Sequence, residues 1–523
     1  MSKDHSLLLV VLLILLLIGI FAFIEETLPK PVDHVIENIS APKIARHVRV
    51  LAHDSLQGRY PGTEGYEKSA LYIKTQMKSM GLQPAFDGSY VQSVTLVSIV
   101  PDYEGYLTIE SEEILKGSYN ETFVIKGLTT GDNEASNIPH QFVGYGIKGR
   151  DWREGSLQNK FVTILYEKPP PSFFESKKQY VANATLNNRI ETLLKENVKG
   201  VGILFPDFNY SWKNIRAYFS SPSMILGNIN KSIPVMLVNP QWTKYFITQE
   251  GLDGYLKENS TASSVSKSNK IGFRVAWKGE KNHFSSANIV GILPGSDPHL
   301  KDEYLLYTAH LDHEGIGESI NGDSIYNGAY DNASGCAIMM ECARAFQLLP
   351  PEERKRSVVF AALTAEERGL LGSKYLAEHL PKGEAIANIN LDMFLMEEPL
   401  SEIVGLGIHY SDLRDEIYKA TNLLNIKLVP DPMPEQNIFF RSDHYSFAAK
   451  GVPALFYFNN FAQPGPNDSL AVNYNWFNTY YHTVFDNFRE DMLFSAGKKF
   501  AQLNFLTGYL VINQKKKPQW VKN

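Results

Sequence analysis

Acidic and histidine side chains recur in a fixed order through the second half of this 523-residue chain. Several of them directly follow short apolar runs, YLLYTA, SVVFAALTA and AIANINL, which are typical of buried β-strands. In an open parallel sheet, ligands bind at the carboxyl ends of the strands. The series therefore predicts a metal site, and the number of ligands indicates two metal ions. The residues are His310, Asp312, Asp331, Glu366, Glu367, Asp392 and His482.

Most of these residues have a second interpretation when each is taken alone. His310 and Asp312 are two apart and share a strand face, so the carboxylate could orient the imidazole, but they could also be a surface polar pair. Asp331 opens DNASG at the start of a predicted helix, where aspartate is a common cap. Glu366 and Glu367 could form the acidic first turn of a helix.

The last two members of the series, Asp392 and His482, differ in how strongly they indicate a metal site. Asp392 ends a strand that is too apolar to hold an unpaired charge, so it must be paired or bound to a metal. His482 lies between aromatic residues in YYHTVFDN and could be a core histidine. Because all the alternatives would have to occur together, we favour the metal site. A carboxylate beside a metal-bound water is the expected general base, and either Glu366 or Glu367 can take that role while the other binds metal.

The region that carries these residues alternates between strand-like and helix-like segments. This alternation predicts an α/β fold with a mostly parallel mixed sheet and helices on both faces. Strands are predicted near residues 287–293, 303–309, 357–363, 386–392 and 452–458, and helices near residues 334–348, 367–379, 411–423, 443–450 and 489–510.

Residues 91–284 have a different character. Short strand-like runs such as KFVTILYE and IPVMLVN alternate with polar loops, and clusters of chemically active side chains are absent from this part of the sequence. We predict an inserted β-rich domain there, with a helix near residues 187–196. The main domain would then consist of residues 41–90, beginning with a helix over 41–52, and residues 285–513, followed by a basic tail over 514–523.

An unbroken apolar run occupies residues 7–24. A membrane-spanning helix needs about 20 apolar residues, whereas a secretory signal has a shorter core and a small-residue cleavage site. Glu25 and Glu26 follow the run without such a site. We expect residues 1–24 to be a signal anchor, with a cleaved signal peptide as the alternative, and residues 25–40 to be a polar stalk. The bulk of the chain would lie outside the cytoplasm, in the periplasm or at the cell surface.

Charge and cysteine content exclude other classes. The net charge is −6 and no basic stripe is present, so nucleic acid is not an expected partner. Cys336 and Cys342 are six residues apart on one predicted helix, where neighbours are three or four apart, so we expect no disulfide between them. The sequence carries no signal for an oligomeric state.

With these residues assembled, the chain resembles the co-catalytic di-zinc aminopeptidase family, which includes bacterial leucyl-type aminopeptidases and the glutamate carboxypeptidase and transferrin receptor relatives. The matching motifs are AHLDHEG, NGAYDNASG, FAALTAEERGLLGS, NINLDMF, RSDHYSF and YYHTVFDN, and GRYPGTEGYEKSALYI resembles the opening segment. The segments FVGYGIKG, KFVTILYE, KGVGILF and IPVMLV resemble the protease-associated domain often inserted in these enzymes. The resemblance implies a zinc exopeptidase-like fold and removal of N-terminal residues from peptides.

The resemblance also implies a set of metal ligands. His310, Asp331 and Asp392 would bind one zinc ion, while Asp331, Glu367 and His482 would bind the other, so that Asp331 bridges the two. Zinc suits a set that mixes imidazole and carboxylate ligands, although manganese or cobalt could replace it.

Catalytic roles follow from the same resemblance. Glu366 would be the general base, and Asp312 would orient His310. Tyr481 would donate a hydrogen bond to the developing oxyanion, a role for which Tyr480 competes.

Three other functions stay open. A carboxypeptidase or dipeptidase of the same family would share the metal site, because the pocket reads the free terminus of the substrate. Arg441 in FRSDH could contact a substrate carboxylate or hold its loop through a nearby acid. Glutaminyl cyclisation uses a similar fold around one zinc ion. A membrane-anchored binding protein would use the inserted domain for recognition and would hydrolyse nothing.

Overall fold

The computed structural model describes residues 28–521, apart from residues 112, 128, 208–209, 228–232, 259 and 462–470. The signal anchor expected over residues 1–24 lies outside the described residues. Within the described part of the chain, no helix is both long enough and apolar enough to cross a bilayer.

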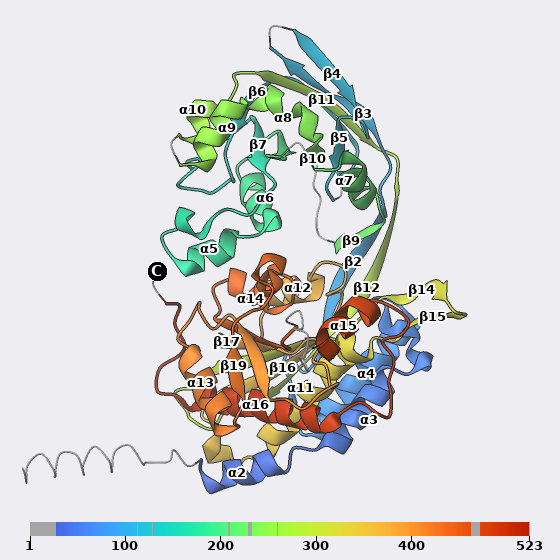
Figure 1. Ribbon diagram of the computed structural model, residues 1–523, viewed down its shortest axis with the longest axis vertical. Helices are drawn as coiled ribbons and strands as arrows, with labels where there is room; N and C mark the ends of the chain where they lie inside the picture. The colour runs from blue at the N-terminus through green and yellow to red at the C-terminus, as the bar shows by residue number, and fades with distance from the viewer. Residues whose placement is uncertain are drawn as a thin grey trace, which may run out of the picture.

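A mixed sheet of ten strands forms the half of the molecule that carries the predicted metal ligands (Figure 1). Its centre, β20–β17–β13–β16, is parallel, and antiparallel pairs flank this centre on both sides. The order is β19 (Lys427–Val429), β18 (Glu402–Leu406), β20 (Ala454–Phe458), β17 (Glu384–Asn390), β13 (Glu303–His310), β16 (Ser357–Leu363), β12 (Glu280–Leu293), β2 (Val91–Val100) and β9 (Ser223–Leu226), with β1 (Gln83–Pro84) beside β12.

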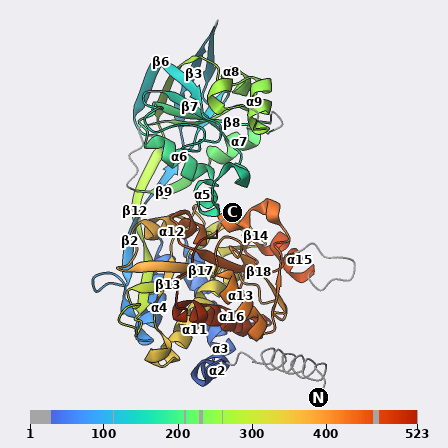
Figure 2. The same cartoon turned by 90° about the vertical axis from the view of Figure 1, so that its left-hand side faces the viewer.

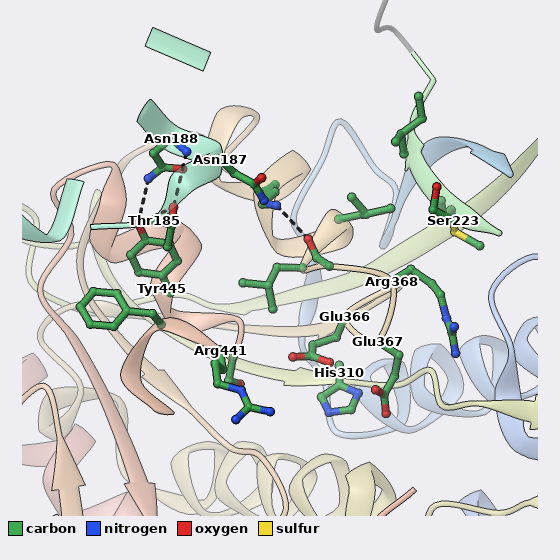
Figure 3. A pocket seen from close by; sticks show the side chains of 18 of the residues that line it. Thr185, Asn187, Asn188, Ser223, His310, Glu366, Glu367, Arg368, Arg441 and Tyr445 are labelled. Atoms are coloured by element: carbon green, nitrogen blue, oxygen red, sulfur yellow. Dashed lines mark hydrogen bonds between the residues drawn. The ribbon is translucent and has the colours of Figure 1, made fainter. Parts of the chain in front are cut away.

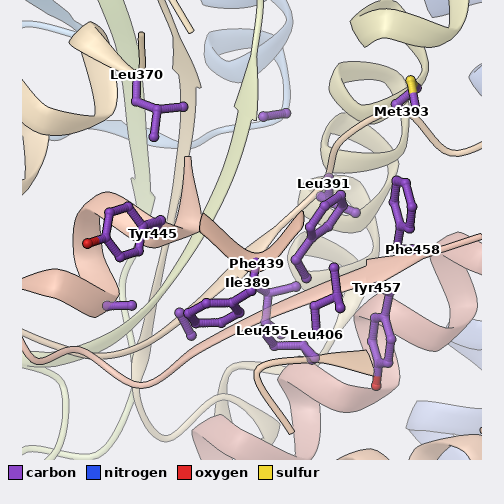
Figure 4. Packing of buried hydrophobic residues seen from close by; sticks show 14 of the residues in the cluster. Leu370, Ile389, Leu391, Met393, Leu406, Phe439, Tyr445, Leu455, Tyr457 and Phe458 are labelled. Atoms are coloured by element: carbon purple, nitrogen blue, oxygen red, sulfur yellow. The ribbon is translucent and has the colours of Figure 1, made fainter. Parts of the chain in front are cut away.

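Helices cover both faces of this sheet, as the alternating pattern predicts. Successive side chains of a strand point to opposite faces, and in β13 Leu305 and Tyr307 join the core on one face while Tyr304 and Leu306 join the core on the other. Figure 4 shows part of the larger core, where side chains of β17 and β20 pack together. The first face is covered by α3 (Ala41–Leu51), α4 (Glu64–Ser79), α11 (Gly335–Leu348), α13 (Arg414–Leu423) and α16 (Phe494–Asn513), and the second by α12 (Leu371–Glu378) and α14 (His444–Ala449).

A second, eight-stranded sheet stands apart from the first (Figures 1 and 2). The long antiparallel strands β2 and β12 lead from the first sheet toward it, and the predicted domain boundaries at residues 91 and 284 fall on these two strands. The order of the second sheet is β4 (Ile114–Ser118), β3 (Tyr103–Glu110), β11 (Lys270–Trp277), β6 (Asp132–Phe142), β7 (Phe161–Leu165), β8 (Gly200–Leu204), β10 (Val235–Val238) and β5 (Phe123–Ile125).

Six α-helices accompany the second sheet within the described residues. Two of them, α5 and α6, lie between this sheet and α14 of the first half (Figures 1 and 2). The six are α5 (Lys177–Asn183), α6 (Leu186–Leu194), α7 (Trp212–Phe219), α8 (Thr243–Phe246), α9 (Gln249–Leu256) and α10 (Ala262–Val265).

Several segments differ from the sequence-based expectation. Residues 30–37, expected to be part of a polar stalk, form helix α2 (Lys30–Glu37), because Val32, Val35 and Ile36 share one face and pack against α11 and α16. Strands β18 and β19 and helix α15 (Ala471–Tyr480) are absent from the predicted elements. The predicted basic tail contacts the rest of the molecule, since Trp520 donates a hydrogen bond from Nε1 to the carbonyl oxygen of Gly451 at 2.8 Å.

Candidate metal centre

The five residues predicted to bind metal come together at the carboxyl ends of the parallel strands. They arrive from five separate places in the sequence, and each lies just beyond an element that fixes its position. His310 ends β13, Asp331 lies in the short turn η4 (Ala329–Ser334) before α11, Glu367 follows β16, Asp392 follows β17, and His482 follows α15.

His310, Asp331 and Asp392 form the first group. Their ligand atoms lie within 4.8 Å of one another. The Nε2 atom of His310 is 3.1 Å from Oδ1 of Asp392 and 3.2 Å from Oδ1 of Asp331. All three side chains are buried. Two carboxylates that face one imidazole nitrogen form a suitable binding site for a cation.

The second group is formed around His482. Its Nε2 atom lies 3.1 Å from Oδ2 of Asp331 and 3.2 Å from Oε2 of Glu367. Asp331 therefore directs Oδ1 to His310 and Oδ2 to His482, which is the arrangement that a bridging carboxylate requires.

Glu366 and Asp312 lie next to these groups. Ligand-type atoms of His310, Glu366 and Glu367 lie within 4.8 Å of one another. The Asp312 carboxylate accepts hydrogen bonds from the backbone amides of Glu366, at 3.1 Å, and Glu367, at 3.3 Å. The Nδ1 atom of His310 faces the backbone carbonyl oxygen of Asp312 at 3.1 Å. We expected the carboxylate of Asp312 to contact His310, but the contact with His310 is made by the backbone carbonyl oxygen of Asp312. The carboxylate of Asp312 instead binds the loop after β16.

Two further residues join the centre, and the sequence reasoning missed both. His313 is fully buried, and its Nδ1 atom lies 2.8 Å from Oε1 of Glu367. Glu314 lies 3.6 Å from Nδ1 of His482 and forms an ion pair with Arg368. The only signal in the sequence was the continuation of His310 into HLDHE, where a second histidine and a further acid follow at once.

Buried polar side chains hold the ligands in place. Asp486 accepts hydrogen bonds from the amides of Tyr330, at 2.9 Å, and Asp331, at 3.0 Å. Ser442 donates a hydrogen bond to Oδ2 of Asp392 at 2.6 Å. Partners of this kind fix the orientation of metal ligands and affect the affinity for the metal.

The backbone beside three site residues is in the left-handed region. The φ angles of Ala365, Met393 and His482 are 54°, 45° and 54°. Non-glycine residues with such angles cost roughly 1–3 kcal/mol each and cluster at functional sites. Ala365 lies between β16 and Glu366, and Met393 directly follows Asp392, and both acidic residues line the same cavity.

Arg59, in the predicted turn GRYPG, ties three segments of the centre together. Its buried guanidinium donates hydrogen bonds to four backbone carbonyl oxygens, those of Leu51, Leu311, Asn327 and Gly328, at 2.5–2.9 Å. Two of these carbonyls lie in the loop before Asp331, and one directly follows His310.

We predict that Arg59→Met destabilises the protein by about 3 kcal/mol or more, because four buried carbonyl groups lose their donor. The melting temperature should fall by roughly 3–5 °C, measured by thermal unfolding, because a chain of this length gains about 1 kcal/mol/K of entropy on unfolding. Bound metal should fall with it, since the ligand loops are released. Arg153→Met at an exposed position is the matched control and should leave both values near those of the wild type. An unchanged melting temperature in Arg59→Met would contradict this role.

A cavity of about 850 Å³ opens above the centre (Figure 3). Its floor contains His310, Asp331, Glu366, Glu367 and Asp392. Its opposite wall comes from the second half of the molecule and from β9, and it mixes apolar and polar side chains. The apolar and aromatic members are Ile190, Tyr218, Phe219, Met224, Ile225, Leu226, Ile233 and Val235, and the polar members include Lys126, Thr185, Asn187, Asn188 and Glu191.

Tyr481 lines this cavity, whereas Tyr480 is not among the residues that line it. The Tyr481 ring stacks on His482, with a centroid distance of 3.9 Å, and on Phe477 at 4.9 Å. Tyr480 packs instead against Trp476, at 6.0 Å. Of the two tyrosines expected to compete for the oxyanion role, Tyr481 is therefore the one that lines the cavity.

The electrostatics of the centre fit bound cations. Burial raises the pKa of Glu366 well above its usual range, and the neighbouring carboxylates raise it further. Burial lowers the pKa of His482, but its hydrogen bonds to Asp331 and Glu367 raise that pKa to about 11. Buried carboxylates are stable as anions only when positive charge lies beside them. Imidazole nitrogens and carboxylate oxygens together form a ligand set that zinc binds.

Comparison with known proteins agrees with this chemistry. Residues 288–502 match the sequence model of peptidase family M28. Aminopeptidase YwaD of Bacillus subtilis (strain 168) is 30% identical over 175 residues, which cover 33% of this chain and 34% of YwaD. Aminopeptidase NAALADL1 of Mus musculus is 34% identical over 116 residues, which cover 21% of this chain and 14% of that protein. The matched segments span about a third or less of these relatives.

Solved structures can also be aligned with the chain. An aminopeptidase from Aneurinibacillus sp. strain AM-1 aligns over 93% of this chain and 96% of its own, with 18% identity and a TM-score of 0.45. The resemblance inferred from the sequence motifs is confirmed by the family match, which contains His310, Asp331, Glu366, Glu367, Asp392 and His482. Residues 288–502, which hold every candidate ligand, therefore match peptidase family M28, and segments of the chain are similar to bacterial and mammalian aminopeptidases and to a probable glutamate carboxypeptidase.

Proposed function

We propose that this protein is a di-zinc exopeptidase that removes N-terminal residues from peptides. The observation that carries the proposal is that the five candidate ligands converge beside Glu366, and that four of them line the floor of one cavity together with Glu366. Asp331 faces His310 with one oxygen and His482 with the other, which supports two metal positions rather than one. Relatives named aminopeptidases support the choice of the N-terminus.

The residues of this chain would share the work as follows. When bound, zinc would polarise the scissile carbonyl and lower the pKa of a water molecule. Glu366 would take a proton from the attacking water and pass it to the leaving amine, as a general base and then a general acid. Tyr481 would donate a hydrogen bond to the oxygen that gains negative charge. Asp312 would hold the amides of Glu366 and Glu367, so that the base stays in register with the ligands.

We further propose that the second sheet is a protease-associated-like domain and that residues 7–24 anchor the protein outside the cytoplasm. The half of the molecule built on the second sheet supplies part of one wall of the cavity, mainly through α6 and α7, which supports a part in substrate contact. The unbroken apolar run over residues 7–24 supports the anchor. The location of the chain can be tested by adding an external protease to cells whose cytoplasmic membrane is intact and accessible. Digestion of the chain is expected, and complete protection would contradict a location outside the cytoplasm.

Hydrolysis assays with metal analysis of the same sample test the main proposal. Purified protein should release leucine from a leucyl anilide and from leucyl peptides, and acylation of the free amine should abolish cleavage. Two zinc ions should be found per chain. Cleavage only from the C-terminus would indicate a carboxypeptidase. One zinc ion with cyclisation of N-terminal glutamine would indicate a glutaminyl cyclase, and no hydrolysis despite two metals would indicate a binding protein.

A further inference from the structure

Arg441 follows the short helix η7 (Ile438–Phe440), and its place in the cavity wall is fixed from two sides. On one side, the next residue, Ser442, is hydrogen-bonded to the metal-type ligand Asp392 at 2.6 Å. On the other side, the preceding Phe440 packs under the ammonium of Lys168, which lies 4.0 Å from the ring centroid. The backbone of Arg441 is therefore held next to the metal centre by contacts from both halves of the molecule.

The second half of the molecule reinforces this position through α14. Asn188 donates a hydrogen bond to the hydroxyl of Tyr445 at 2.9 Å, and that hydroxyl donates to the carbonyl oxygen of Val181 at 3.1 Å. Lys168 also donates to Oδ1 of Asn437 at 2.6 Å. These hydrogen bonds hold the segment that carries Arg441 in place, so the position of the Arg441 backbone at the cavity is fixed.

The guanidinium of Arg441 has no ion pair, side-chain hydrogen bond or aromatic partner among the described residues. Its side chain is exposed and lines the cavity together with Glu366 and His310. Figure 3 shows it beside these two residues, on the floor side of the cavity. The other role considered for Arg441 was to hold its loop through an ion pair with a nearby acid, and no such ion pair is found among the described residues. Arg368, another arginine of the lining, is by contrast paired with Glu314.

An unpaired guanidinium inside a peptide-binding cavity has a clear chemical preference. Its planar fork matches the two oxygens of a carboxylate, and it is less strongly hydrated than an ammonium group. The other cations of the lining have partners of their own. Arg368 is paired with Glu314, Lys374 donates a hydrogen bond to the carbonyl oxygen of Gly369, and Lys126 lies over the ring of Phe219. A carboxylate of the substrate would therefore find its strongest partner at Arg441.

We propose that Arg441 is a specificity-determining residue that binds a carboxylate of the peptide substrate, a proposal that rests on the exopeptidase function above. The carboxylate is either the C-terminal group of a short peptide or the side chain of an acidic residue after the scissile bond. Both sources present the same bidentate acceptor, and the experiment separates them.

The test compares two pairs of ligands on the full-length, zinc-loaded protein. In the first pair, a leucyl dipeptide carries a free or an amidated C-terminus. In the second, an amidated leucyl dipeptide carries aspartate or asparagine as its second residue. Each pair is measured as kcat/KM for the cleavable peptide and, by calorimetry, as the Kd of an analogue whose scissile amide is replaced by an uncleavable methyleneamine.

The wild type should prefer the carboxylate member of at least one pair by about tenfold, the size expected for a charge-assisted hydrogen bond in a partly exposed site. The pair that shows the preference identifies the source of the carboxylate. Arg441→Ala should reduce the preference to near one, Arg441→Lys should keep part of it, and the exposed control Arg153→Ala should keep all of it.

Two results would overturn the proposal: no preference for either carboxylate in the wild type, or an unchanged preference in Arg441→Ala. The calorimetric arm separates this outcome from failure of the proposed function. If the wild type hydrolysed neither peptide, the exopeptidase function would be wrong, while the ratio of Kd values would still decide whether Arg441 binds a carboxylate.

Discussion

Glu366→Gln should lower kcat by about 10²–10⁴-fold while leaving the zinc content unchanged. Glutamine has the shape of glutamate but cannot accept a proton from water at the attacking oxygen. The backbone amide of residue 366 would still donate to Asp312, so the loop after β16 should keep its form. In the wild type, burial raises the pKa of Glu366, which makes its carboxylate a stronger base than an exposed glutamate.

The measurement is kcat on a leucyl anilide together with metal analysis by mass spectrometry of the same preparations. Glu366→Asp is the informative companion, because it keeps the carboxylate and withdraws it by one methylene group, and it should retain more activity than the glutamine variant. Activity within tenfold of the wild type in Glu366→Gln would remove Glu366 from the role of base. Loss of zinc in that variant would make it a ligand instead.

Asp331→Asn should release both metal ions, which makes it the most damaging change among the ligands. The two oxygens of Asp331 face different histidines, so one substitution weakens both positions. Loss of a hydrogen-bonding partner behind a metal ligand already costs about 10–100-fold in metal affinity, and loss of the shared charged ligand should cost at least about 100-fold. Activity at limiting zinc should fall by a similar factor.

Substitutions that affect one position only provide the comparison. Asp392→Asn should reduce bound zinc from two ions toward one, because Asp392 faces His310 and not His482. Competition with a chromogenic chelator measures both affinities in each variant. Equal zinc loss in Asp331→Asn and Asp392→Asn would show that Asp331 does not bridge.

Three of the five candidate ligands could be picked out from the sequence because each follows a local signal. His310, Glu367 and Asp392 come directly after continuous apolar runs, and such runs become central parallel strands whose ends meet at one edge. The β13, β16 and β17 strands were therefore placed within a few residues, and the parallel centre of the sheet followed from the alternation with helices.

The residues that support the ligands could not be predicted in the same way. Arg59 and Asp486 act on backbone groups far from them in sequence, and no local pattern announces such partners. Asp312 illustrates the same limit, because its spacing suggested a contact with His310, whereas its carboxylate accepts the amides of Glu366 and Glu367. Tertiary packing also converted part of the expected stalk into α2, whose apolar face is too short to stand out in the sequence.

Titration of zinc into the metal-free protein tests the central claim most directly. Protein treated with a chelator should be inactive on a leucyl anilide and should regain activity as zinc is added, reaching full activity at two equivalents per chain. Glu366→Gln should bind the same two equivalents and stay inactive. Full activity of the wild type at one equivalent, or activity that is independent of metal, would contradict a two-metal centre built on Asp331.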